Sequence, residues 1–237
     1  MGKPNLQIAL DSQSLSEALE TVREVGDIVD ILEVGTVLCL QDGMEAVRAI
    51  RALYPEKTIL ADTKCADAGK TVAKNCKDAG ADWMTVICCA TIPTMKAANE
   101  AIDQLQVELY GDWTFDQAEE WKNIGIEQVV YHQSRDALLS GQTWGEKDLE
   151  KIKKLIDMGF KVSVTGGLDV ETLDIFKGID VYTFIAGRGI AKASDPRQAA
   201  IDFKEKINEI FWWKKETAMK FFLDTANIDE IKRINDL

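Results

Sequence analysis

A short stretch in the first third of the chain carries two carboxylates and a lysine at close spacing. It reads ADTKCADAGK and contains Asp62, Lys64 and Asp67. In an extended backbone, residues two positions apart project to the same side, so Asp62 and Lys64 would share a face. Such an array can keep the lysine charged and can present carboxylate oxygens to a divalent cation. Taken alone, the same spacing also suits a surface salt bridge, which contributes less than about 1 kcal/mol to stability.

Another carboxylate, Glu33, lies among apolar residues in the segment VDILEV. A carboxylate in such surroundings must be satisfied by a metal ion, a cation or a network of hydrogen bonds. If the segments that carry Glu33 and Asp62 are neighbouring strands, the two residues would form an oxygen site suited to Mg²⁺. Water and substrate oxygens would complete its coordination. The alternative is a structural ion pair between Glu33 and Lys64.

The chain contains a single histidine, His132, which ends the apolar segment QVVYH and precedes Arg135 by three residues. An imidazole near neutral pH can deliver or relay a proton, and an arginine can hold a carboxylate or a water molecule. A lone histidine is more often a surface or structural residue. Its role therefore depends on where the fold places this segment.

Eight short apolar segments alternate with longer amphipathic ones along the chain. The expected strands cover residues 6–10, 29–34, 58–61, 83–88, 107–109, 128–131, 161–164 and 181–185. The expected helices cover residues 15–25, 43–53, 69–79, 92–105, 115–123, 147–158, 170–176 and 196–211, with Ser14 and Glu17 as a capping box for the first. Near-continuous apolar strands between helices indicate a parallel sheet. The pattern predicts an α/β fold with a single (β/α)₈ TIM barrel, and an open doubly wound sheet is the alternative.

In such a barrel the active site lies at the carboxyl ends of the strands. Polar or glycine residues follow almost every expected strand: Asp11, Glu33, Asp62 with Lys64, Glu108, His132, Thr165, and Gly187 with Arg188. The carboxylates, the lysine and the histidine are therefore predicted to surround one mouth. This placement favours a catalytic role for them over an isolated surface role.

Two glycine-containing segments follow the last two expected strands. They are VTGGL, residues 164–168, and AGRG, residues 186–189. Barrel enzymes frequently bind phosphate at these two positions through backbone N–H groups. Glycine allows close approach of the backbone to an anion, and Arg188 adds a charged partner. The substrate is therefore predicted to carry a phosphate group.

Composition excludes several other classes of protein. The chain has 237 residues, of which 40 are acidic and 28 basic, so its formal charge of −12 argues against nucleic-acid binding. One histidine cannot build a multi-histidine zinc centre. We expect no membrane partner, because no apolar run approaches the roughly 18 residues of a membrane-spanning helix and the first residues lack signal-peptide order. Five cysteines without a CxxC pair are typical of reduced thiols, which predicts a cytoplasmic location.

Several of these segments together resemble one family of enzymes. They are LQIALD, IVDILEVGT, ILADTKCADAGK, GADWMTVICCA, VELYGDWTFDQAEEW, VVYHQSRDA, VTGGL and FIAGRGI. The chain resembles the orotidine 5′-monophosphate decarboxylase suprafamily, whose mark is D-x-K-x-x-D on the third strand, over about residues 5–213. ELYGDWTFDQ and YHQSRDA are similar to the members that decarboxylate 3-keto-L-gulonate 6-phosphate rather than to the related hexulose-6-phosphate synthases.

The resemblance implies a carboxy-lyase of L-ascorbate catabolism that forms L-xylulose 5-phosphate and CO₂ through a cis-enediolate. It implies that Glu33 and Asp62 bind Mg²⁺ and that Lys64 stabilises the enediolate. It also implies that Asp67 reaches the site of a neighbouring subunit and pairs with Lys64 there. The implied partners are thus a phosphorylated sugar acid and a second copy of the chain, in a homodimer with shared active sites.

The resemblance further assigns proton handling to His132 and Arg135. The residues that it places at the substrate are Asp11 and Glu108 near the hydroxyl groups, and Thr165, Gly167, Gly187 and Arg188 at the phosphate. Two alternatives remain open from the sequence. One is synthase-type aldol condensation of formaldehyde with ribulose 5-phosphate. The other is a non-catalytic barrel that binds sugar phosphates.

The chain continues beyond the point where the barrel could close. We therefore expect residues 1–213 to form the catalytic barrel and residues 214–237 to form a short C-terminal extension. The extension includes AMKFFLDTANIDEIKRINDL, which has the pattern of one strand and one helix and resembles the start of a transaldolase-type sugar-phosphate enzyme. One such unit cannot build a second barrel, so we expect the extension to be non-catalytic.

Overall fold

Eight parallel strands form a closed barrel in the order of the sequence, from β1 to β8 and back to β1. The computed structural model describes residues 2–225, with side chains up to Trp212. The strands are β1 (Asn5–Leu10), β2 (Ile31–Val34), β3 (Thr58–Cys65), β4 (Trp83–Ile87), β5 (Gln104–Leu109), β6 (Gln128–His132), β7 (Lys161–Thr165) and β8 (Thr183–Ala186). The predicted (β/α)₈ barrel is confirmed, and the open-sheet alternative is wrong.

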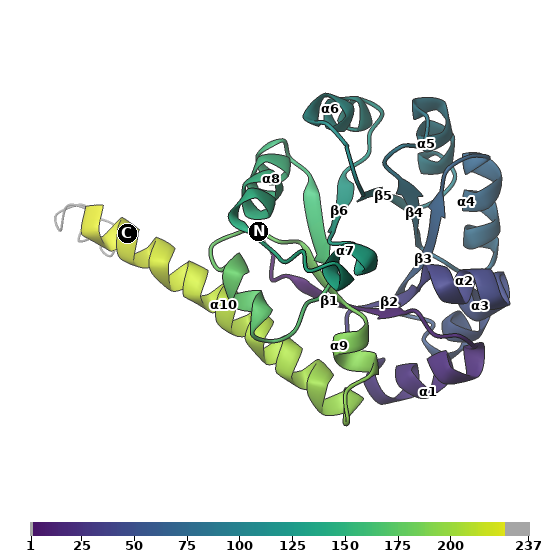
Figure 1. The fold of residues 1–237 in the computed structure, drawn as a ribbon, viewed down its shortest axis with the longest axis horizontal. Helices are drawn as coiled ribbons and strands as arrows, with labels where there is room; N and C mark the ends of the chain where they lie inside the picture. Colours follow the sequence, from purple (N-terminus) through teal and green to yellow (C-terminus); the bar gives the residue numbers. More distant parts are fainter. Residues whose placement is uncertain (1, 226–237) are drawn as a thin grey trace, which may run out of the picture.

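Helices surround this barrel, as Figure 1 shows. They are α1 (Leu15–Val25), α2 (Thr36–Asp42), α3 (Met44–Leu53), α4 (Gly69–Asp78), α5 (Ile92–Asn99), α6 (Phe115–Asn123), α7 (Arg135–Leu139), α8 (Glu146–Asp157), the 3₁₀ helix η1 (Thr172–Phe176), α9 (Arg188–Ala191) and α10 (Pro196–Thr225). Each of the longer helices buries one apolar side. Ala18, Val22 and Val25 of α1, for example, are fully buried at helical spacing.

The N-terminus of α1 departs slightly from the expected capping box. Ser14 accepts a hydrogen bond from the backbone N–H of Glu17, as predicted. The Glu17 carboxylate, however, accepts from the backbone N–H of Gln13 at 3.2 Å rather than from Ser14. In a capping box the Glu17 carboxylate would accept from the Ser14 N–H, whereas here it accepts from the N–H of Gln13, one residue earlier.

The expected helix over residues 92–105 is wrong in its second half. The helix α5 ends at Asn99, and β5 already begins at Gln104. Gln104, Gln106 and Glu108 alternate with apolar residues, and Gln106 and Glu108 line the barrel interior. The predicted strand over residues 107–109 is confirmed as the second half of β5, and polar residues on the inward face hid the first half from a search for continuous apolar runs. The short helices α2, α7 and α9 also went unpredicted, because they lie in the loops at the carboxyl ends of the strands.

The strand expected at the start of the segment AMKFFLDTANIDEIKRINDL is also wrong. The helix α10 continues without interruption to Thr225, and its C-terminal part projects beyond the other elements in Figure 1. Because the barrel is closed, it leaves no unpaired strand edge for another strand to join. The rest of the predicted extension, residues 226–237, lies outside the described residues. Among residues 2–225, no helix is long and apolar enough to cross a membrane.

Candidate active site at the carboxyl ends of the strands

A cavity of about 690 Å³ opens at the carboxyl ends of the strands. Every predicted site residue except Asp67 lines it. These residues are Asp11, Glu33, Asp62, Lys64, Glu108, His132, Arg135, Thr165, Gly167, Gly187 and Arg188. Their convergence follows from the barrel itself, because parallel strands in register end at the same rim. His132 of β6, for example, pairs directly with Thr165 of β7.

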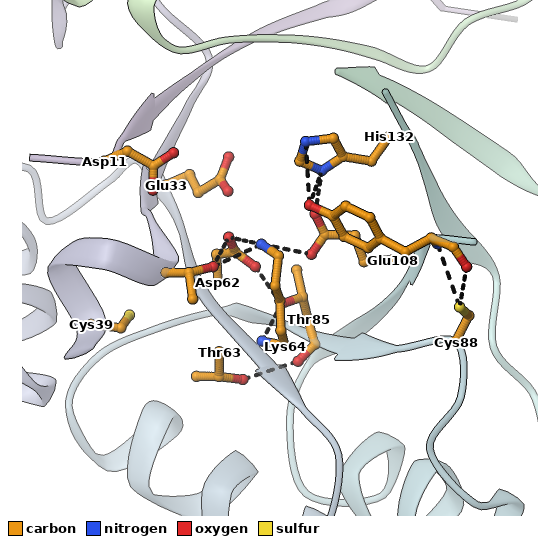
Figure 2. A network of polar contacts seen from close by, with 12 residues as sticks. Asp11, Glu33, Cys39, Asp62, Thr63, Lys64, Thr85, Cys88, Glu108 and His132 are labelled. Atoms are coloured by element: carbon orange, nitrogen blue, oxygen red, sulfur yellow. Dashed lines mark hydrogen bonds and ion pairs between the residues drawn. The ribbon is translucent and has the colours of Figure 1, made fainter. Parts of the chain in front are cut away.

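Lys64 forms the centre of the charged cluster drawn in Figure 2. Its Nζ lies 2.5 Å from Oδ2 of Asp62 and 3.0 Å from Oε2 of Glu108. Burial alone would lower the pKa of the Lys64 ammonium, but the charges of Asp62 and Glu108 outweigh burial and raise this pKa well above its usual value. The cavity therefore contains a lysine that stays charged at every pH of biological interest.

Asp62 is held by two further contacts, from Thr85 and Thr36, that the sequence did not suggest. Thr85 of β4 donates to its Oδ1 at 2.7 Å. Thr36, the first residue of α2, donates to its Oδ2 at 2.5 Å and accepts from Lys64 at 2.7 Å. Burial raises the pKa of Asp62, but the charge of Lys64 and the hydrogen bonds from Lys64, Thr36 and Thr85 lower it below its usual value overall. Asp62 is therefore a buried carboxylate that remains ionised.

Glu33 is buried beside Asp62, with 7% of its surface exposed. Gln7 donates to its Oε2 at 2.6 Å. Burial and the charge of Asp62 raise the pKa of Glu33 well above its usual value, against the smaller effects of Gln7 and Lys64. A divalent cation would remove this repulsion between two carboxylates, and oxygen donors of this kind are the ligands that Mg²⁺ prefers. The pair therefore fits the predicted metal.

Mg²⁺ usually binds six ligands, and the two carboxylates of Glu33 and Asp62 supply only part of this set. Among residues 2–225, no group of three or more histidine, cysteine, aspartate or glutamate side chains is arranged to hold a metal ion. Mg²⁺ commonly binds through one or two carboxylates and keeps water or substrate oxygens as its other ligands. The donor set in this cavity has that open form.

Glu108 joins the lysine to the histidine. Its Oε1 lies 2.6 Å from Nδ1 of His132, and its Oε2 forms the ion pair with Lys64. Tyr110 places its hydroxyl 2.7 Å from the same Nδ1. Tyr110 was not predicted, although it follows Glu108 by two positions and so points to the same side of the extended chain. The single histidine is thus held by a carboxylate and a phenol at the cavity wall.

Arg135 begins α7, which lies over the mouth in the view of Figure 1. Its Nη2 lies 3.2 Å from Oδ2 of Asp11, which follows β1. Both side chains are partly exposed, at 47% and 32%, so this pair can open to admit a ligand. The two predicted residues therefore meet in the wall of the cavity.

The loop after β7 has the geometry expected of a close backbone approach. Gly166 and Gly167 have positive φ angles of 102° and 63°. A Cβ atom on Gly166 would lie 2.0 Å from the carbonyl oxygen of Gln133. Trp144 donates its indole N–H to the Gly166 carbonyl at 2.8 Å. Thr165, Gly187 and Arg188 line the same part of the cavity, so the predicted phosphate-binding groups are brought together.

Asp67 differs from the other predicted site residues. It is exposed in the loop between β3 and α4 and does not line the cavity of its own chain. The Cys65 thiol donates to the backbone carbonyl of Asp67 at 3.0 Å, a contact that does not use the carboxylate. The Asp67 carboxylate can therefore face another molecule.

Comparison with known proteins identifies relatives along most of the chain. Residues 4–203 match the model of the orotidine 5′-phosphate decarboxylase / HUMPS family. The chain is 53% identical over 215 residues to a 3-keto-L-gulonate-6-phosphate decarboxylase, UlaD, of Escherichia coli. That alignment covers 89% of this chain and 100% of the relative.

Solved structures give a consistent result. A crystal structure of KGPDC from Streptococcus mutans is 61% identical, with a TM-score of 0.87 and coverage of 88% of this chain and 99% of that one. The structure of 3-hexulose-6-phosphate synthase from Salmonella typhimurium is 28% identical, with a TM-score of 0.82 and coverage of 87% and 99%. The two relatives share the fold, and the first is much more similar in sequence.

Proposed function

The chain belongs to the orotidine 5′-phosphate decarboxylase / HUMPS family, and from this premise we propose how its cavity works as an active site. The protein is a carboxy-lyase that decarboxylates 3-keto-L-gulonate 6-phosphate to L-xylulose 5-phosphate and CO₂. The single observation that carries the mechanism is the charged Lys64 between Asp62 and Glu108 in the cavity.

Decarboxylation of the substrate requires a group that stabilises the negative charge formed as CO₂ leaves. When the bond between the carboxylate and the neighbouring carbon breaks, its electron pair moves onto the ketone oxygen and an enediolate forms. The Lys64 ammonium is pre-oriented by two carboxylates and need not reorganise as that charge develops. Fixed charges in a partly dehydrated cavity are usually the largest contribution to catalysis. Lys64 therefore stabilises the enediolate electrostatically.

Glu33 and Asp62 would hold Mg²⁺. The ion would supply a second positive charge for the oxygens of the substrate. Thr36, Thr85 and Gln7 serve this arrangement by fixing the two carboxylates through the hydrogen bonds described above. The pairing of Asp62 with Lys64 keeps Asp62 ionised, as a metal ligand must be.

His132 and Arg135 relay and position, through a water molecule, the proton that completes the reaction. After CO₂ leaves, the enediolate carbon takes up one proton, and the resulting product is neutral at that carbon. His132 lines the cavity and is anchored by Glu108, while Arg135 can hold a water molecule or a substrate oxygen at the rim. Asp11 contacts the substrate hydroxyls, and Glu108 orders the polar network around them.

Thr165, Gly167, Gly187 and Arg188 bind the phosphate group. The two consecutive glycines with positive φ angles allow the backbone to approach an anion, and Arg188 offers a charged donor from the neighbouring loop after β8. A phosphate bound at this end would place the carboxylate end of the substrate toward Lys64, across the cavity.

A homodimer with shared sites accounts for the position of Asp67. Its exposed carboxylate would enter the cavity of a second copy and pair with Lys64 there. Mixing inactive Lys64→Ala and Asp67→Ala proteins, with subunit exchange, should restore about a quarter of the wild-type activity, because half of the dimers are mixed and each carries one intact site. An inactive mixture that still contains mixed dimers would show that Asp67 acts within its own chain.

The central experiment is a CO₂-release assay with 3-keto-L-gulonate 6-phosphate in Mg²⁺ and then with a chelator. We expect activity that requires the ion and falls about 10³-fold in Lys64→Ala. The matched control is Lys77→Ala, which removes an exposed lysine paired with Asp103 at 2.7 Å and should leave the rate unchanged. Equal rates in wild type and Lys64→Ala would overturn the site assignment. Formaldehyde consumption with ribulose 5-phosphate but no CO₂ release would favour the synthase reaction instead.

A further inference from the structure

Tyr110 is placed beside the histidine that the proposed function uses for proton transfer. Its hydroxyl lies 2.7 Å from Nδ1 of His132 and 3.3 Å from Nε2, and the two rings are stacked at a tilt with centroids 4.6 Å apart. The phenol therefore covers one side of the imidazole and places its oxygen nearest to Nδ1. A rotation of the imidazole would disturb both of these contacts.

The backbone of Tyr110 is itself fixed. Its N–H donates to the sulfur of the buried Cys88 at 3.4 Å, and the Cys88 thiol donates to its carbonyl oxygen at 3.3 Å. Its ring centre lies 5.9 Å from Nζ of Lys64, which is within the range of a cation–π contact. Tyr110 thus bridges the lysine and the histidine from a rigid position at the end of β5.

The protonation of this cluster follows from its chemistry. An ionised Glu108 carboxylate can only accept, so a contact of 2.6 Å requires the proton on Nδ1 of His132. Burial and the nearby charge of Glu108 raise the pKa of Tyr110 far above its usual value, so its hydroxyl keeps its proton. Tyr110 can therefore donate toward Glu108 while its oxygen lies against the Nδ1–H group.

We propose that Tyr110 is a positioning residue for His132. With Glu108 it fixes the imidazole with the proton on Nδ1, so that Nε2 is the nitrogen that exchanges a proton with the substrate. The proposal deepens the proposed function and rests on it for the identity of the reaction. The effect of Tyr110 on the His132 imidazole can be tested without any substrate.

The test uses the fact that His132 is the only histidine of the chain. Protein labelled with ¹⁵N-histidine and free of an affinity tag gives the signals of one imidazole, so long-range ¹H–¹⁵N spectra report its tautomer directly. In wild type we expect a protonated Nδ1, an unprotonated Nε2 and a slowly exchanging Nδ1 proton. In Tyr110→Phe we expect that proton to exchange with water at least about tenfold faster and part of the population to carry it on Nε2.

Tyr131→Phe is the matched control. Tyr131 immediately precedes His132, and its hydroxyl donates to Asp148 at 2.7 Å on the helix side of β6. The change removes a phenol hydroxyl with an equally short hydrogen bond, and it should leave the His132 signals as in wild type. Wild-type protein with the proton on Nε2 would overturn the proposal. Tyr110→Phe spectra identical to those of wild type would overturn it as well.

Kinetics separate positioning from general structural support. Tyr110→Phe should lower kcat about tenfold with KM within a factor of about three, because phosphate binding lies elsewhere in the cavity. In a His132→Asn background the same change should have no further effect on kcat, since its target is gone. Independent, multiplicative effects would contradict the proposal. If none of the proteins releases CO₂, the proposed function fails, whereas the imidazole spectra still decide the role of Tyr110.

Discussion

Lys64 and Asp62 are two residues apart on β3, and Nζ of the lysine lies 2.5 Å from Oδ2 of the aspartate. The strand is irregular between them. Its register with β4 shifts between Ala61 and Cys65, and Lys64 itself has a positive φ of 43°. Such a backbone is costly for a residue other than glycine and persists where surrounding contacts hold it. Here the backbone N–H of Lys64 donates to Thr85 at 2.9 Å, and its ammonium is held by two carboxylates.

Removing the charge of Lys64 should therefore destabilise the protein as well as inactivate it. We predict that Lys64→Met lowers the free energy of unfolding by about 3 kcal/mol in metal-free buffer, because Asp62 loses its counter-charge in a buried site. Urea unfolding at neutral pH measures this. The double variant Lys64→Met/Asp62→Asn should recover most of the loss. A single variant as stable as wild type would mean that the ion pair contributes nothing to the fold.

The loop after β7 should tolerate no side chain at its first glycine. In Gly166→Ala the new Cβ would meet the carbonyl oxygen of Gln133 at 2.0 Å, at a φ of 102°. We predict that KM for the phosphorylated substrate rises more than about tenfold, since the loop must move away from the anion. Gly141→Ala is the control, because Gly141 has a similar φ of 92° with open space around it. Equal KM values in the two variants would show that strain alone, and not the contact with Gln133, is responsible.

Trp144 should hold the same loop in place through its hydrogen bond to the Gly166 carbonyl. Trp144→Phe removes the 2.8 Å hydrogen bond to the Gly166 carbonyl and keeps an aromatic ring against Tyr131 and Phe176. We predict a rise of about three- to tenfold in KM with little change in kcat, because one hydrogen bond contributes about 1 kcal/mol. Steady-state kinetics and the Kd of inorganic phosphate test this. Trp113→Phe, which alters another ring that contacts Tyr131, should leave both constants unchanged.

The sequence predicted the residues at the strand ends better than the contacts between them. Asp62, Glu108 and His132 could be placed at one rim because the barrel topology alone brings the strand ends together. The role of Tyr110 could not be predicted in that way, since it depends on how far across the rim a phenol reaches. Nor could the positive φ of Lys64, which results from contacts with β4 and β5 rather than from local preference.

The boundaries that failed have a similar explanation. The strand β5 carries Gln104, Gln106 and Glu108 because its inward face forms part of the polar cavity, so local hydrophobicity indicated a helix up to residue 105. The predicted strand near residue 220 failed for the opposite reason. An apolar run such as FFL suits a strand locally, yet a closed barrel leaves it no partner. In both cases the fold overrides the local pattern.

Alkaline pH should destabilise the protein through its buried thiols. Burial raises the pKa of Cys76 from 9.0 to about 12, so the folded state keeps a proton that the unfolded state releases above pH 9. The unfolded state then binds fewer protons, and stability falls as pH rises from 9 to 12, by about 1.4 kcal/mol per unit from this thiol. Urea unfolding between pH 8 and 11 should show a shallower decline for Cys76→Ala. The exposed Cys89 offers a control, since Cys89→Ala should decline as steeply as wild type.

Truncation tests the proposed division of the chain into a barrel, residues 1–213, and a non-catalytic extension, residues 214–237. The first half of α10 packs on the barrel through Phe203, Ile207 and Ile210, which are buried, whereas Trp212 is 57% exposed. Deleting residues 214–237 should therefore leave kcat and KM within about 20% of wild type and the melting temperature nearly unchanged, because Phe203, Ile207 and Ile210 are retained. Deleting from residue 203 onward should unfold the protein, because it removes the three buried side chains and about 3 kcal/mol or more of packing. If the shorter deletion folds normally but loses its turnover, the extension takes part in catalysis and the boundary at residue 213 is wrong.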